Sequence, residues 1–274
     1  VIAASVVLIV FFAHESAAYP VDAAEKTGIV RLEAYDVASR GESRGKVIPL
    51  GALLPEEKVR LRLVDQPGFV LPSPDEDLTS ALRAFLGGDA SRYGVAFLDM
   101  SDPTRPRYAE INGALTQSPG SVGKILIALA VFQELADAHP TDLEARRRVL
   151  RETRVVADGF IQKDDHLVPF YTPVQGDVAG DLGHRPVVEG DSANLWTWLD
   201  WMLSASSNAA ASVVMREMLL LAQFGADYPV DAATATRFFA TTPKSELSKL
   251  LRDTMDGAAR RSGLDTARLR QGTF

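Results

Sequence analysis

The amino-acid sequence predicts an α+β fold, a mixed α/β sandwich in which a small antiparallel sheet packs against a helical cluster. Two observations predict it: an antiparallel hairpin over 93–112, and a long apolar helix that begins at Ser121 and precedes further apolar helices. The chain has 274 residues, of which 46% are hydrophobic, enough for a substantial core. Internal repeats are absent from the sequence, which argues against a solenoid.

The N-terminal part begins with an apolar run. Residues 1–13 are uncharged and apolar, a stretch too short for a bilayer span but typical of a signal peptide. We therefore expect 1–18 to be a signal peptide or membrane anchor, with a buried strand or core helix as the alternative. Apolar and polar residues alternate over 28–37 and 57–66, which predicts short strands and makes 19–70 a small β-rich lead-in.

The main domain is expected to span 71–274 and to combine helices with the hairpin. Ser73-Pro74-Asp75 opens the first helix, and Gly87-Gly88 ends it. The helix from Ser121 extends to His139-Pro140, and its middle is apolar on nearly every side, which is typical of a buried helix. Further helices are expected near 146–154, 193–203, 208–222 and 242–262.

Charge and cysteine content exclude several functions. The net charge is -7, with 29 Lys and Arg against 36 Asp and Glu, so no overall basic field indicates nucleic-acid binding. The chain has no cysteine, which excludes disulfides, zinc–thiolate sites, iron–sulfur clusters and thiol catalysis.

A serine and a lysine begin the apolar helix in the pattern S-x-x-K. Ser121 and Lys124 are three residues apart, so a helix places the hydroxyl and the amine on one face. Serine is a weak nucleophile until a base takes its proton, and lysine is such a base only when its pKa is lowered. Free N–H groups at the helix start could stabilise an oxyanion. The alternative is a capping serine beside a surface lysine.

Two further polar clusters could carry chemistry. Asp164-Asp165-His166 could bind a metal or could be a solvated loop; His139 and His184 also lie in loop-like sequence. Ser206-Ser207-Asn208 interrupts two apolar helices, where it could be a C-cap followed by an N-cap or part of a site.

Together, S-x-x-K at Ser121 and S-x-N at Ser206 resemble the first two motifs of class A β-lactamases and penicillin-binding proteins. YGVAFLDMSDPTRPRYAEINGALTQSPGSVGKILIALAVF resembles the family's strand pair and nucleophile helix, and VVEGDSANLWTWLDWMLSASSNAAASVVM its S-x-N segment. The resemblance covers about 75–222. It implies a β-lactamase/transpeptidase-like fold in which Ser121 is acylated and Lys124 is its base or proton relay. Ser206 would pass a proton to the leaving nitrogen, and Asn208 would hold the substrate's amide side chain and Lys124. No metal or organic cofactor is implied.

The chain departs from the family pattern at several places. Ser207 replaces the customary Asp, and the distance between the motifs implies an insertion at about 140–186. Glu246 is the nearest candidate for a deacylating residue, with a surface helix position as the alternative. Lys26-Thr27-Gly28 spells the third motif but precedes the nucleophile, so we interpret it as a chance match. The C-terminal strands of the family are expected to be missing, which predicts an exposed strand edge and an open site with Ser121 near its rim.

These expectations predict an exported serine hydrolase, periplasmic or in the cell envelope of a bacterium. It would act through an acyl-enzyme on a β-lactam or a peptidoglycan-type peptide, with membrane attachment through the N-terminal apolar segment as one possibility. Within the fold the alternative is an esterase-like or non-catalytic member. The alternative outside the enzymes is a penicillin-binding envelope protein or scaffold protein without turnover.

Overall fold

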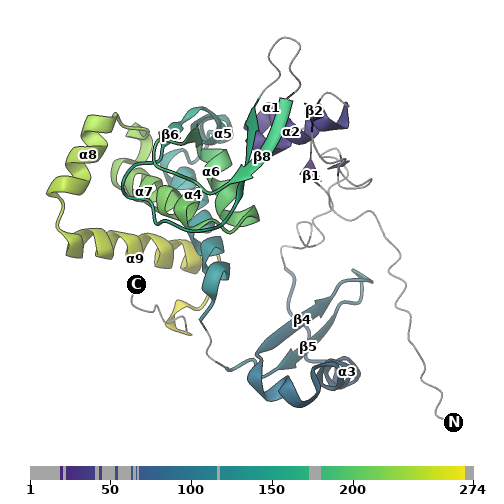
Figure 1. Ribbon diagram of the computed structural model, residues 1–274. Coiled ribbons are helices and arrows are strands. Elements are labelled where there is room, and N and C mark those ends of the chain that lie inside the picture. Colours follow the sequence, from purple (N-terminus) through teal and green to yellow (C-terminus); the bar gives the residue numbers. More distant parts are fainter. Residues whose placement is uncertain are drawn as a thin grey trace. The chain divides into compact units, whose positions relative to one another are not determined.

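The computed structural model describes residues 19–20, 23–40, 43–44, 53–54, 63, 66, 68–115, 118–172 and 180–268. The chain divides into two compact units (Figure 1). One unit covers 60–120, and the other combines the parts of the chain on either side of it. Helices and small sheets occur together, so the coarse expectation of an α+β fold is confirmed.

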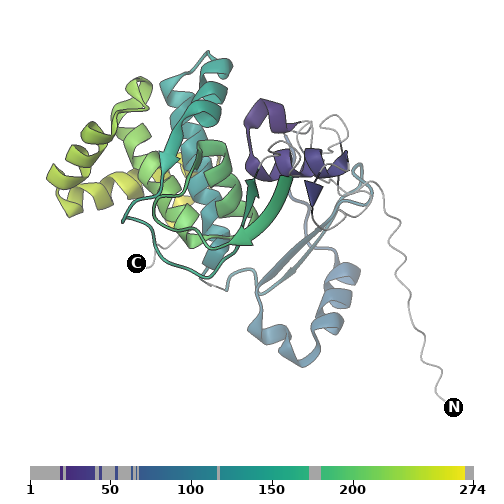
Figure 2. The same ribbon diagram turned by 45° about the horizontal axis from the view of Figure 1, so that its top comes forward.

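Three helices form the centre of the larger unit: α4 (Lys124–Ala138), α6 (Leu195–Ser204) and α7 (Asn208–Phe224). All three contact one another and lie side by side in Figures 1 and 2. Their apolar faces make the core, in which Trp198 and Met202 are fully buried. The Trp198 indole donates a hydrogen bond to the Val155 carbonyl at 3.1 Å, so this polar group is satisfied inside the core.

The outer helices begin at side-chain caps or at proline. Asp142 and Asp231 accept first-turn amides of α5 (Leu143–Glu152) and α8 (Ala232–Thr241), as N-cap carboxylates do. Pro243 precedes α9 (Lys244–Arg261), which packs along α4 and also contacts α7. The helices expected near 146–154 and 242–262 are thus present within a few residues of their expected ends.

Short strands surround these helices. The largest sheet in the described residues has the order β2-β8-β7, with β7 antiparallel and β2 parallel to β8. Two pairs accompany it, β6 antiparallel to β9 and β1 parallel to β3. The strands are β1 (Tyr19–Pro20), β2 (Ser43–Arg44), β3 (Leu53–Leu54), β6 (Arg154–Val156), β7 (Val168–Thr172), β8 (Gly180–Arg185) and β9 (Ser192–Asn194).

The strand expected over 28–37 is wrong. This segment forms most of helix α2 (Val30–Ser39), which follows the short helix α1 (Ala23–Thr27). Leu32 and Ala34 are two apart, as on one face of a strand, and Ala34 and Val37 are three apart, as on one face of a helix. Such short apolar patterns do not separate a strand from a helix. The apolar start 1–18 and most of 57–66 lie outside the described residues.

The smaller unit contains the expected helix and hairpin. Asp75 caps α3 (Glu76–Leu86) by accepting the Leu78 amide at 2.8 Å, and Gly87, at a φ of 56°, ends it. β4 (Val95–Asp99) pairs antiparallel with β5 (Arg107–Ile111), against which α3 packs. Among the described strands, β4 pairs only with β5. Arg107 binds Asp75 and lowers the pKa of that carboxyl to about 2.

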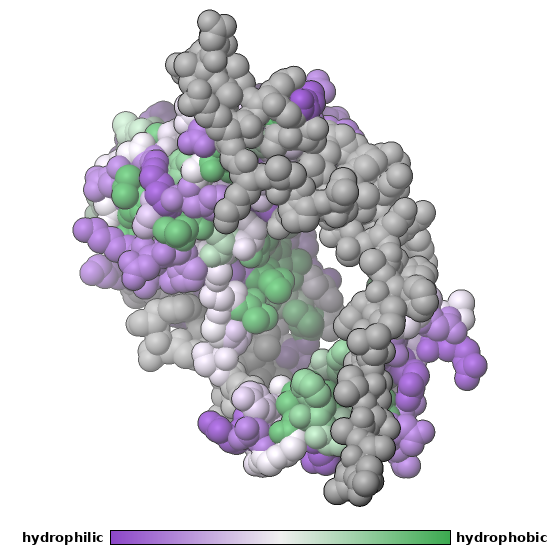
Figure 3. All heavy atoms as spheres, turned by 45° about the vertical axis from the view of Figure 1, so that its right-hand side comes forward, coloured by the Kyte–Doolittle hydropathy of each residue, from purple (hydrophilic) through white to green (hydrophobic). Residues whose placement is uncertain are grey.

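Apolar side chains also reach the surface, where they form the green areas of Figure 3. The exposed apolar side chains include Val122, in the turn before α4, and Ile125 and Phe132, on α4 itself. Within the described residues, one stretch is long and apolar enough to cross a membrane, 208–227, and most of it is buried in the core. Such burial is typical of a core helix of the protein.

Candidate functional site

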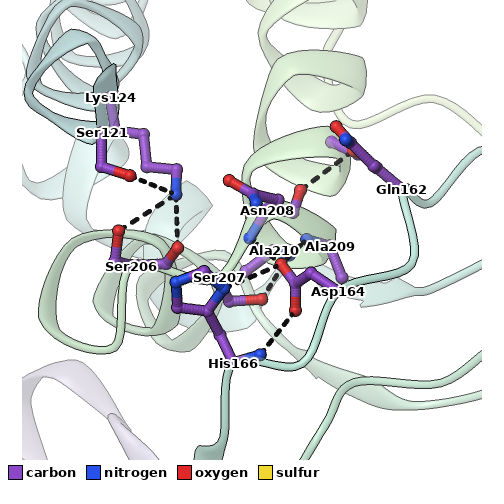
Figure 4. Close-up of polar contacts among 11 residues, drawn as sticks. Ser121, Lys124, Gln162, Asp164, His166, Ser206, Ser207, Asn208, Ala209 and Ala210 are labelled. Atoms are coloured by element: carbon purple, nitrogen blue, oxygen red, sulfur yellow. Dashed lines mark hydrogen bonds and ion pairs between the residues drawn. The ribbon is translucent and has the colours of Figure 1, made fainter. Parts of the chain in front are cut away.

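Ser121 and Lys124 lie together at the start of α4. A single 3₁₀ turn, Gly120–Gly123, carries Ser121 and leads directly into α4, whose first residue is Lys124. The lysine amine donates to the Ser121 hydroxyl at 3.3 Å (Figure 4). Ser121 is exposed, whereas Lys124 is only 7% exposed. The hydroxyl is therefore open to solvent while its amine neighbour is buried, and the alternative of a surface lysine is wrong.

Ser206 completes a cluster of three polar side chains. It lies in the break between α6 and α7 and adopts a φ of 59°, in the left-handed region that non-glycine residues rarely occupy. The amine of Lys124 donates to the Ser206 hydroxyl at 3.2 Å and also to the Ser206 carbonyl. A single amine thus contacts both serine hydroxyls, as Figure 4 shows.

Burial and a nearby carboxylate act in opposite directions on Lys124. Burial disfavours the charged amine and lowers the pKa of Lys124 below that of an ordinary lysine, while the Asp164 carboxylate partly opposes this shift. A lowered pKa raises the fraction of neutral amine, the form that can take a proton from a serine hydroxyl.

Asn208 lies next to the cluster as the first residue of α7. Its carbonyl accepts the Ser212 hydroxyl at 3.0 Å. Figure 4 shows its side chain beside the turn that carries Ser206. In the described part of the chain no hydrogen bond joins this side chain to Lys124, so the contact that the resemblance implies is not formed here.

Asp164 is the site residue that sequence reasoning did not identify. The sequence pattern suggests a metal ligand or part of a solvated loop, yet the side chain of Asp164 is only 6% exposed. Its Oδ2 accepts the amides of Asn208 and, at 2.9 Å, Ala209. Among the described residues, no three His, Asp or Glu side chains lie together so that they could hold a metal ion, Asp164-Asp165-His166 included.

The remaining candidates lie elsewhere. Glu246 is exposed in the first turn of α9, which matches its surface-helix alternative. Lys26-Thr27-Gly28 lies at the end of α1, and the carbonyls of Thr27 and Gly28 accept the Asn194 side chain. The K-T-G sequence thus lies at a helix end, whereas the family pattern places its third motif on a strand.

The fold and the cluster define an α+β protein with a Ser-Lys-Ser arrangement between a buried helix and a helix–helix turn. Comparison with protein-family models, with curated proteins and with solved structures found no match.

Proposed function

We propose that this chain is an exported serine hydrolase of the β-lactamase/penicillin-binding type, with Ser121 as its nucleophile. One observation carries the proposal: the buried amine of Lys124 lies within hydrogen-bond distance of both serine hydroxyls, at 3.3 Å from Ser121 and 3.2 Å from Ser206. A nucleophile, a base and a second proton carrier are what acyl transfer to a serine requires.

The proposed reaction begins when Ser121 Oγ attacks the carbonyl carbon of a β-lactam or a peptide. Its proton passes to the neutral amine of Lys124, which the lowered pKa favours. The carbon–nitrogen bond then breaks as Ser206 Oγ gives its proton to the leaving nitrogen and takes the proton held by Lys124. The products are an ester on Ser121 and a free amine, and water hydrolyses the ester in the second half.

Acylation of Ser121 is the test of this proposal. The purified protein is incubated with a fluorescent penicillin and, separately, with a fluorophosphonate, and intact mass is measured before peptide mapping. We expect one adduct per chain, located on Ser121, and none in Ser121→Ala. Ser245→Ala, an exposed position on α9, serves as the matched control and should still form the adduct.

The outcomes separate the candidate functions. A penicillin adduct that turns over indicates a β-lactamase, and one that persists indicates a penicillin-binding protein. An adduct with the fluorophosphonate alone indicates an esterase-like member. No adduct with either reagent, or adducts at other residues only, would contradict the proposal and favour the scaffold alternative.

A further inference from the structure

A buried carboxylate supports the turn that carries Ser206. Asp164 lies 44 residues before Asn208 in the sequence, yet its Oδ2 accepts the amides of Asn208 and Ala209 at the start of α7. Ser207 Oγ accepts the next amide, that of Ala210, at 3.1 Å. The free N–H groups of a helix start, together with its positive dipole end, stabilise a carboxylate in this position.

Ser206 lies two residues before the first amide that Asp164 binds. Ser206 holds a left-handed backbone conformation, and such conformations persist only where neighbouring contacts determine them. The residues after it are tied to Asp164, and its own hydroxyl and carbonyl both accept from Lys124. Release of the start of α7 would therefore free Ser206 to turn away from the amine.

The charge of Asp164 also acts on Lys124. The carboxylate raises the pKa of the lysine against the larger effect of burial. From the loop that carries Asp164, His166 faces it, with Nδ1 at 3.6 Å from Oδ2, and Lys163 and Asp165 are exposed neighbours. From α4, Lys124 is the facing charge, whereas α7 offers only its backbone amides.

We propose that Asp164 is a positioning residue that holds the Ser206–Asn208 turn against Lys124 during acylation of Ser121. The inference rests on the proposed function. It assigns a role to the 140–186 region, which the sequence indicated only as an insertion. Asp164 acts through the turn and through Lys124, and it does not itself contact Ser121 among the described hydrogen bonds.

Two substitutions separate the charge of Asp164 from its hydrogen bonds. Asp164→Asn keeps an acceptor but replaces the charge-assisted hydrogen bonds to Asn208 and Ala209 by weaker neutral ones. The turn is then held less firmly, and acylation by penicillin should fall on the order of 100-fold because small misplacements have effects of that size. The acid limb of its pH–rate profile should move to lower pH, since Lys124 loses the charge that raises its pKa. Asp164→Glu keeps the charge and should lower the rate without moving the limb.

Controls distinguish this role from a merely structural one. Asp165→Asn makes the same charge change at the exposed neighbour and should leave rate and profile unchanged. His166→Gln tests whether the limb belongs to the histidine, and the limb should stay in place. If the native protein is acylated and Asp164→Asn is acylated at the same rate with the same pH–rate profile, this inference alone is overturned. A native protein that does not acylate overturns the proposed function and this inference with it.

Discussion

Replacement of Lys124 by methionine tests the proposed base directly. The two side chains are of similar length and unbranched, so Lys124→Met keeps the packing at the start of α4 and removes only the amine. That amine contacts the hydroxyls of Ser121 and Ser206 and the Ser206 carbonyl. General-base catalysis by a side chain contributes about 100- to 10,000-fold, so the acylation rate should fall by that factor.

The same variant should change how stability depends on pH. Burial lowers the pKa of Lys124 in the folded state, while in the unfolded chain it lies near the ordinary lysine value of about 10.4. Between these two values the unfolded chain binds more protons, so this residue makes stability rise with pH across that window. Below the window the buried charge costs stability, and above it both states are neutral.

Stopped-flow acylation with a fluorescent penicillin measures the first effect, and urea unfolding of the native protein and the variant at a series of pH values measures the second. The stability of the native protein relative to Lys124→Met should increase with pH across the window. Lys249→Met is the control, because Lys249 is exposed on α9 and pairs there with Asp253. A variant that acylates at the native rate refutes the base assignment, and a stability difference independent of pH refutes the lowered pKa.

Two further predictions concern buried polar groups of α7. Ser207→Ala should lower the free energy of unfolding by about 1–2 kcal/mol in urea, because the Ala210 amide loses its cap inside the protein; a change under about 0.3 kcal/mol would contradict this. Tyr228→Phe removes the hydrogen bond that the phenol donates to buried Glu217 at 2.9 Å and should cost about 1–2 kcal/mol. Burial raises the pKa of Glu217, while Arg216 and the Tyr228 hydrogen bond lower it, so the loss should grow as the pH rises and more of Glu217 is ionised; a loss independent of pH would argue against this.

Local sequence patterns predicted the helices and the hairpin whose signals lie within one short segment. The apolar run after Ser121 and the break at Ser206 produced helices close to their observed bounds, because periodicity and caps are local signals. The hairpin in the smaller unit was predicted in the same way. The segment 28–37 was predicted as a strand and is a helix, since a short apolar pattern does not separate the two.

Long-range contacts were beyond reach of such patterns. β6 pairs with β9 across the whole 157–191 stretch, and no residue in either strand signals its partner. Asp164 is a similar case, because an acidic residue in a polar loop looks solvated until the fold brings a helix start onto it. Ser121, Lys124 and Ser206 could be predicted as a group only through the family resemblance, since spacing alone brings together just the first two.

The backbone of Ser206 has a consequence for how the site could change over time. A left-handed conformation costs a non-glycine residue about 1–2 kcal/mol, and glycine adopts it without that cost. A lineage that kept this fold solely as a framework would gain stability from the single change Ser206→Gly. In this chain the serine hydroxyl accepts from the amine of Lys124, so that change would give up this contact in return for a relaxed backbone.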